Sequence, residues 1–231
     1  MKQAALITGA SSGIGMAIAE QLLREDWEVF GIGRDFSGCD LVNHESFHAW
    51  KMDLLEEEAL RQALTDLPKD RLTLLVNNAG AAWYGPHETI GMKEIQTMVR
   101  TNLEVPMILS GLLLRTLRDN HGMIINIASI TALHTSTHGA VYGALKAGLL
   151  HFSRTLLEEN RKSGLRVTAI LPDMTDTKLY RNASFKADTE FGASLSSDQV
   201  AQAVMCAIHQ PEGSLISELV LEPQLHRIRK K

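Results

Sequence analysis

The sequence predicts an α/β fold: a doubly wound, seven-stranded parallel sheet with helices on both faces. Short apolar runs alternate with stretches of helical periodicity, a glycine-rich turn joins the first run to the first helix, and no repeat or linker divides the chain. We expect one domain spanning residues 1–231. The predicted strands lie near residues 4–8, 28–33, 48–52, 72–77, 122–127, 165–170 and 216–221. The predicted helices lie near residues 14–25, 55–66, 92–118, 142–162 and 197–209.

Composition narrows the class of protein. The chain has 231 residues, 45% of them hydrophobic, and a formal net charge of −4, which suits a globular domain and does not favour nucleic-acid binding. Cys39 and Cys206 have no metal-ligand spacing, so we expect reduced thiols, no metal site and a cytoplasmic protein. No apolar run reaches the length of about 18 residues that a membrane helix needs. The basic residues 227–231 are predicted to form a solvated tail.

The first predicted strand runs into a turn that contains Gly9, Gly13 and Gly15, and helix 14–25 follows. Glycines allow a tight turn and a close approach of a pyrophosphate, and the helix N-terminus offers unpaired N–H groups to it. The spacing Gly-x-x-x-Gly-x-Gly differs from the generic dinucleotide-binding fingerprint. A simple strand-to-helix turn without a ligand is therefore the alternative.

Tyr142 and Lys146 are four residues apart in predicted helix 142–162, so their side chains share one helix face. A nearby cation favours the phenolate and lowers the pKa of a tyrosine from its usual value of about 10. Such a tyrosine can exchange a proton with a substrate oxygen. Taken alone, the same spacing is typical of an exposed helix face.

Together these motifs resemble the short-chain dehydrogenase/reductase family, in its compact single-domain branch, over nearly the whole chain. The resemblance implies a Rossmann fold. Further motifs follow in the family's order, and Ser129 precedes Tyr142 by the family's 13 residues. The positions that match are the cofactor turn at 8–15, the adenine-contacting acid Asp53, the segment 77–80 after the fourth strand, the active-site asparagine Asn102, and the catalytic Ser129, Tyr142 and Lys146.

The resemblance implies interconversion of a ketone or aldehyde with an alcohol by hydride transfer. Tyr142 would act as general acid or base at the substrate oxygen, and Ser129 would bind that oxygen. Lys146 would lower the pKa of Tyr142 and bind the nicotinamide ribose, and Asn102 would hold a water that relays protons. The implied cofactor-binding residues are Gly9, Ser11, Ser12, Gly13, Ile14, Gly15, Arg34, Asp53, Leu54, Asn78, Ala79, Gly80, Tyr142, Lys146, Pro172, Thr175 and Thr177.

The end of the second strand indicates which nicotinamide cofactor is used. An acidic residue there would bind the ribose hydroxyls and repel a 2′-phosphate, but the matching position is Gly33 and Arg34 follows. Guanidinium pairs well with phosphate. NADP(H) is therefore favoured and NAD(H) stays possible, since Asp35 could pair with Arg34 and Ser12 supplies no extra positive charge.

Residues 172–197 are the least regular stretch, and we expect them to form a loop with a short helix at the carboxyl edge of the sheet. In this family the loop reads as a lid over the substrate; an ordinary surface loop is the alternative. The family's Pro-Gly-x-x-x-Thr reads Pro172, Asp173 and Thr177 here. If a positive φ is needed at the glycine position, Asp173 adopts it at some cost.

The candidate substrate pocket is mostly aromatic and apolar, which suits a moderately hydrophobic small molecule. Lys178, Arg181 or Lys186 could instead meet a carboxylate. The candidate wall residues are Trp83, Tyr84, His134, His138, Met174, Leu179, Tyr180, Phe185 and Phe191.

Two other functions stay open. The first is a non-catalytic NADP(H)-binding regulator that retains the fold. The second is a dehydratase or epimerase of the extended sugar-nucleotide type, which shares the Tyr-x-x-x-Lys spacing but needs a larger carboxyl-terminal region. The resemblance also implies a homodimer or homotetramer through helices 92–118 and 142–162, although their apolar faces could pack only on their own sheet.

Overall fold

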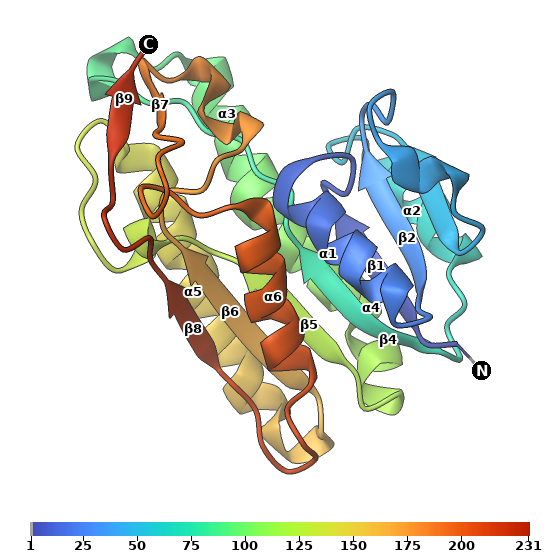
Figure 1. Cartoon of the computed structure of the whole chain (residues 1–231). Coiled ribbons are helices and arrows are strands. Elements are labelled where there is room, and N and C mark those ends of the chain that lie inside the picture. Colours follow the sequence, from blue (N-terminus) through green and yellow to red (C-terminus); the bar gives the residue numbers. More distant parts are fainter. Residues whose placement is uncertain (1) are drawn as a thin grey trace.

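The computed structural model describes residues 2–231 and confirms the predicted fold class, a parallel seven-stranded sheet between two layers of helices (Figure 1). The strand order is β3-β2-β1-β4-β5-β6-β8. The strands are β1 (Ala4–Thr8), β2 (Glu28–Gly33), β3 (Phe47–Lys51), β4 (Leu72–Asn77), β5 (Met123–Ile127), β6 (Arg166–Pro172) and β8 (Glu218–Leu221). The helices are α1 (Gly13–Arg24), α2 (Glu57–Ala63), α3 (Met92–Val99), α4 (Val105–Asp119), α5 (Ala140–Asn160) and α6 (Ser197–Ile208).

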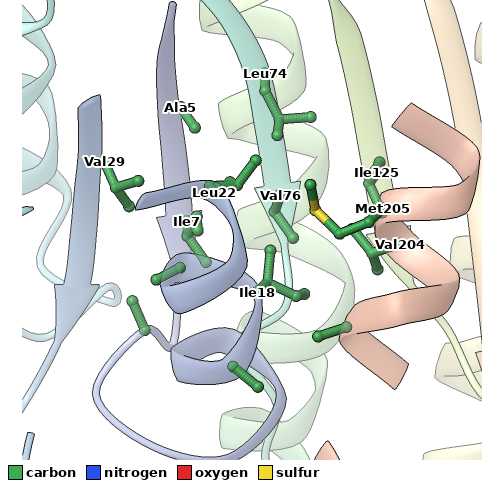
Figure 2. Close-up of a cluster of buried hydrophobic side chains, with 14 of the residues drawn as sticks. Ala5, Ile7, Ile18, Leu22, Val29, Leu74, Val76, Ile125, Val204 and Met205 are labelled. Carbon is green, nitrogen blue, oxygen red and sulfur yellow. The ribbon is translucent and has the colours of Figure 1, made fainter. Parts of the chain in front are cut away.

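Each central strand is apolar on both sides because helices cover both faces of the sheet. In β1, Ala5 and Ile7 belong to the core beneath α1 and α6, whereas Ala4 and Leu6 belong to the core beneath α2, α4 and α5. Figure 2 shows the first core, with side chains of α1 and α6 packed over those of the central strands. The uninterrupted burial of β1 is therefore a direct consequence of two-sided packing.

The long helix predicted at 92–118 is divided in three. A π-helical turn, Arg100–Glu104, separates α3 from α4, and Pro106, which has no backbone N–H to donate, lies in the first turn of α4. The helix predicted at 55–66 is shorter, since α2 ends at Ala63 and a 3₁₀ turn follows. No helix within residues 2–231 is long and apolar enough to cross a membrane.

The sheet reverses its winding direction between β1 and β4. Strands β2 and β3 continue on one side of β1, and β4 lies on the other side. In open α/β sheets, ligands bind at the carboxyl edge beside such a point, because the loops there diverge to opposite faces. The glycine turn after β1 and the segment after β4 both leave the sheet at this edge.

Two predictions about the carboxyl-terminal part were incomplete. The 172–197 segment contains a 3₁₀ helix, Lys178–Asn182, and a strand, β7 (Phe185–Ala187). Residues 227–231 are not only a solvated tail, because β9 (Ile228–Lys230) pairs antiparallel with β7. Both strands are drawn together at the top of Figure 1. Opposite charges assist the pairing, since Arg229 contacts Asp188 at 2.8 Å.

Candidate active site

The glycine turn after β1 leaves the start of α1 without a side-chain cap. Gly9 and Gly13 have φ of +69° and +59°, a conformation that side chains disfavour. Ser12 precedes α1 without capping it through its side chain, and the first turn carries no acidic residue. The N–H groups at the start of α1 therefore remain available to a phosphate.

Thr8 and Asn78 hold this turn against the segment after β4. The Thr8 hydroxyl accepts hydrogen bonds from the backbone N–H groups of Asn78 and Ala79, both at 3.0 Å. The Asn78 side chain in turn donates to the carbonyl groups of Thr8 at 2.9 Å and Gly9 at 3.2 Å. The two loops on either side of the β1–β4 reversal are thus joined into one rigid edge.

One cavity of about 470 Å³ runs along this edge. It brings together most of the residues predicted from the sequence, from the glycine turn to the 172–197 segment. The predicted residues on its wall are Gly9, Ser11, Ser12, Gly13, Ile14, Arg34, Asp53, Leu54, Asn78, Ala79, Gly80, Trp83, Ser129, Tyr142, Lys146, Pro172, Thr175, Thr177, Leu179 and Tyr180.

Three side chains from β5 and α5 meet on the cavity wall. Ser129 follows β5 and caps a 3₁₀ turn, accepting hydrogen bonds from the Thr131 backbone N–H at 3.2 Å and from the Thr131 hydroxyl at 3.0 Å. Tyr142 and Lys146 lie in the first turns of α5 and are both buried. The Lys146 Nζ lies 5.5 Å from the centre of the Tyr142 ring and donates to the Ile127 carbonyl at 2.8 Å.

Taken together, the protein's own groups raise the pKa of Tyr142, contrary to the expectation from the helix spacing. Burial raises the pKa of this phenol, the charge of Tyr180 adds to the rise, and a hydrogen bond with Ser129 only partly opposes it. Burial also lowers the pKa of Lys146 to about 8. Desolvation is therefore the largest influence on the pKa of both side chains.

Asn102 is fully buried in the π-helical turn behind the cavity wall. Its Nδ2 donates to the Ala81 carbonyl at 2.7 Å and to the Met98 carbonyl at 2.9 Å. Its Oδ1 has no hydrogen-bond partner within residues 2–231. A buried amide oxygen left unpaired is costly, so this atom is suited to accept a hydrogen bond from a water molecule or a ligand.

Arg34, at the end of β2, forms no ion pair with the nearby carboxylates Asp35 and Asp53 within the described chain. Asp35 accepts hydrogen bonds from the backbone N–H and the hydroxyl of Ser37, both at 3.0 Å, and makes no ion pair with Arg34 among the described residues. Asp53 accepts from the Leu55 backbone N–H at 3.0 Å and does not cap α2, whose N-cap is Glu56. The Arg34 guanidinium on the cavity wall is consequently available to an anion.

Comparisons with known proteins decide the family. The family model of short chain dehydrogenases matches residues 3–188. The chain belongs to the short-chain dehydrogenase family. It is therefore an oxidoreductase of the class that interconverts alcohol and carbonyl groups, and the resemblance drawn from its motifs is confirmed.

Individual relatives of this short-chain dehydrogenase cover nearly its full length. A serine 3-dehydrogenase of Rhizobium radiobacter is 35% identical over 230 residues, which cover 94% of this chain and 92% of the relative. A metagenomic short-chain oxidoreductase solved in complex with NADP is 28% identical, with a TM-score of 0.80 and coverage of 96% and 97%. An alcohol dehydrogenase from the archaeon Thermococcus sibiricus shares the fold, with a TM-score of 0.86 at 24% identity and coverage of 98% and 99%.

Several predicted residues of the short-chain dehydrogenase lie off the cavity wall: Asn102, described above, Gly15, Tyr84, His134, His138, Met174, Phe185 and Phe191. A Cβ on Gly15 would overlap the Gly9 carbonyl, so this glycine serves the packing of α1 on the turn. His134 is exposed on a loop, and Met174 faces away because the chain there alternates, with its neighbours on either side facing the cavity.

Tyr84 lies behind the wall in a cluster of aromatic rings. Its ring centre is 5.8 Å from that of Tyr142, 5.9 Å from that of Tyr180 and 5.2 Å from that of Phe185. Edge and tilted contacts at such distances are favourable. Tyr84 therefore supports the position of Tyr142 rather than forming the cavity surface.

The sequence reasoning missed several wall residues. Ile127 and Ala128 line the cavity at the end of β5, and their place at a strand's carboxyl end was the signal that could have found them. Thr97 and Thr101 reach the cavity from the α3 side, and no motif in the sequence points to them. Asp173, already noted at the family's glycine position, lines the cavity as well, and it does so without the positive φ that the family glycine suggested.

Proposed function

We propose that this short-chain dehydrogenase is an NADP(H)-preferring oxidoreductase that interconverts a ketone or aldehyde with a secondary or primary alcohol, with Tyr142 as general acid and base. One observation carries the proposal. Ser129, Tyr142 and Lys146 share a single cavity wall with the glycine turn and Arg34. A proton-transfer group, an anion site and a cation for a further phosphate thus lie in one continuous space.

The residues fit the cofactor. The glycine turn and the start of α1 would hold the pyrophosphate, Asp53 and Leu54 the adenine, and Lys146 the nicotinamide ribose. Arg34, exposed and without an ion pair in the described part of the chain, would take the 2′-phosphate through paired N–H donors. The metagenomic relative solved with NADP supports this preference.

When bound, the nicotinamide supplies the hydride chemistry. Ser129 would donate its hydroxyl hydrogen to the substrate oxygen and hold it beside the Tyr142 phenol. Tyr142 would give this oxygen a proton in reduction and take one in oxidation. Lys146, as a cation, and the positive charge of an oxidised nicotinamide would both favour the phenolate and so oppose the rise in pKa that burial causes. The unpaired Asn102 Oδ1 would hold the water of the relay.

Residues 172–197 are proposed to act as a lid, since Thr175, Thr177, Leu179 and Tyr180 all contribute to the cavity wall. The serine 3-dehydrogenase of Rhizobium radiobacter suggests a small hydroxylated acid as the first substrate to try. Lys178 and Arg181 on the wall favour such an acid over the purely hydrophobic substrate that the aromatic residues suggested.

The first experiment measures NADPH and NADH oxidation, by nicotinamide absorbance, with a panel of aldehydes and ketones and the reverse reaction with hydroxy acids. We expect turnover with NADPH, and a loss of about 10²- to 10⁴-fold in Tyr142→Phe, because general acid–base catalysis contributes that much. NADPH binding, followed by fluorescence, serves as the control and stays unchanged in the variant. Undiminished turnover in Tyr142→Phe contradicts the mechanism; binding with no turnover on any substrate favours the regulator.

A second experiment tests the cofactor preference. Arg34→Ala removes the proposed phosphate ligand, so kcat/KM for NADPH falls by about 10-fold or more while that for NADH stays the same. Arg61→Ala is the matched control, because Arg61 is exposed on α2 and pairs only with Glu57. An equal fall for both cofactors argues against a phosphate contact at Arg34.

A further inference from the structure

Asp173 is a carboxylate in an unusual place for this fold. It directly follows β6, where the family motif has glycine, and it lines the same cavity as Ser129 and Tyr142. Its side chain is only 8% exposed. Burying a carboxylate is costly unless it is paired with a cation and hydrogen-bonded. We therefore expect the Asp173 carboxylate to have hydrogen-bond or ion-pair partners.

Only one of the two carboxylate oxygens has a partner among residues 2–231. The Oδ2 atom lies 2.5 Å from Nδ1 of His226, whereas Oδ1 makes no hydrogen bond within the described chain. Asp173 is therefore held from one side, and its second oxygen remains available to a ligand in the cavity.

His226 is held firmly in place for this contact. Its neighbours Leu225 and Arg227 donate backbone hydrogen bonds to the carbonyl groups of Gly192 at 2.8 Å and Ala193 at 2.9 Å. His226 itself has a φ of +45°, a conformation that non-glycine residues adopt only when the surroundings fix it. The segment before β9 thus presents the imidazole to Asp173 from outside the cavity.

A group of opposite charge lies on the same wall. Arg181, in the 3₁₀ helix Lys178–Asn182, lines the cavity and makes no ion pair in the described chain. Tyr180 lies next to it in sequence, and burial raises the pKa of this phenol to about 12, with the negative charge of Asp173 contributing to the rise. A carboxylate and a guanidinium, each with free capacity, therefore lie on the wall of the cavity that also contains Tyr142.

We propose that Asp173 is a specificity-determining residue that binds the ammonium group of a 2-amino-3-hydroxy acid, with Arg181 taking the substrate carboxylate and His226 acting as the positioning residue for Asp173. This inference rests on the proposed function and deepens it. The reaction is the same: C3 loses a hydride to NADP⁺, and the hydroxyl proton passes to the Tyr142 phenolate. A carboxylate in the cavity also repels a second acid group, which excludes dicarboxylic substrates.

The test compares two substrates that differ only in the ammonium group, serine (both enantiomers) and 3-hydroxypropionate, in NADP⁺ reduction by the full chain. Wild type favours serine. Asp173→Asn and Asp173→Gly lower kcat/KM for serine by about 10- to 100-fold, mainly through KM, and leave that for 3-hydroxypropionate unchanged or higher, because only one substrate loses a charge-assisted hydrogen bond. His226→Gln lowers kcat/KM for serine relative to that for 3-hydroxypropionate, but by less than the Asp173 variants do. His209→Gln, which removes a similar surface contact with Glu25 at 2.9 Å, leaves it unchanged.

The outcomes separate the two proposals. An equal fall for both substrates in Asp173→Asn, or a wild type that prefers 3-hydroxypropionate, overturns the role of Asp173 while Tyr142-dependent turnover still supports the oxidoreductase. A wild type that turns over neither substrate but reduces other carbonyl compounds overturns the substrate class alone. Turnover of no compound at all overturns the proposed function together with this inference.

Discussion

Lys146 is a residue whose charge depends on the fold. Its ammonium is buried beside Tyr142 with one carbonyl partner, and burial lowers its pKa from 10.5 to about 8. The unfolded chain therefore holds this proton more tightly than the folded protein between these two pH values. By linkage, the free energy of unfolding rises as the pH increases through this window, because Lys146 loses its proton in the folded protein first. Below a pH of about 8 the folded protein contains the buried cation and is destabilised by its full desolvation cost.

Replacing Lys146 with methionine keeps most of the apolar stem and removes the charge. We expect Lys146→Met to be more stable than wild type near pH 7 by up to about 3 kcal/mol, a difference that disappears as the pH approaches 10.5. Urea unfolding, followed by circular dichroism at several pH values, measures this difference in the free energy of unfolding. The titration of the buried tyrosines contributes equally to both proteins and therefore cancels in the difference. Parallel stability curves would show that Lys146 keeps its ordinary pKa in the fold.

At the scale of elements, the contact between the glycine turn and α1 sets the geometry of the proposed phosphate site. A Cβ on Gly15 would overlap the Gly9 carbonyl oxygen and the Asn78 amide, and would lie 2.9 Å from the Gly9 carbonyl carbon. Gly111, in contrast, is in the middle of α4 with open space where a Cβ would be. The same substitution therefore has opposite effects at the two positions.

Gly15→Ala is expected to lower the free energy of unfolding by about 1–3 kcal/mol through overpacking, and to weaken NADPH binding because α1 shifts. Gly111→Ala is expected to raise it by about 0.5–1 kcal/mol, since alanine loses less backbone entropy in a helix. Denaturant unfolding at one protein concentration tests both. An unchanged free energy of unfolding in Gly15→Ala would mean that α1 shifts away from Gly9 without an energetic cost.

The elements that were predictable are those whose signal is local. β1 is an unbroken apolar run, and α5 carries Tyr142 and Lys146 at helical spacing, so both could be placed within a few residues. The β7–β9 pair was missed because each strand has three residues and the partners are more than 40 residues apart. The contact of Asp173 with His226 spans 53 residues and joins two loops, so no periodicity reveals it. The direction of the pKa shift at Tyr142 depends on burial, which helix spacing alone does not report.

At the scale of the whole molecule, a buried polar chain ties the two central strands to two helices. Asn77 of β4 donates to Asn126 of β5 at 2.8 Å and contacts Ser110 of α4 at 3.3 Å, and Asn126 donates to Ser153 of α5 at 2.8 Å. Buried polar groups linked in this way fix how α4 and α5 lie on the sheet. The outer face of α4 nevertheless keeps apolar side chains in solvent, Met107 at 39% and Leu112 at 42% exposure.

Assembly through this face is the remaining prediction about the whole molecule. We expect a homodimer or homotetramer, and we expect Leu112→Glu to shift it to a smaller species, because a charge on an apolar contact must be buried without a partner. Light scattering after size-exclusion chromatography gives the mass. Val42→Glu is the control, since Val42 is similarly exposed, at 44%, but lies outside α4. A monomeric wild type contradicts the prediction.

The close contact between Gly9 and Gly15 has a genetic consequence. The atoms that would obstruct a side chain at position 15 include the backbone carbonyl of residue 9, which every amino acid carries. No substitution at residue 9 can remove that obstruction, whereas an enlarged core side chain can be offset by a smaller neighbour. In a library of random variants, we expect revertants of Gly15 mutants to restore glycine itself, and single-residue suppressors elsewhere in the chain to be rare.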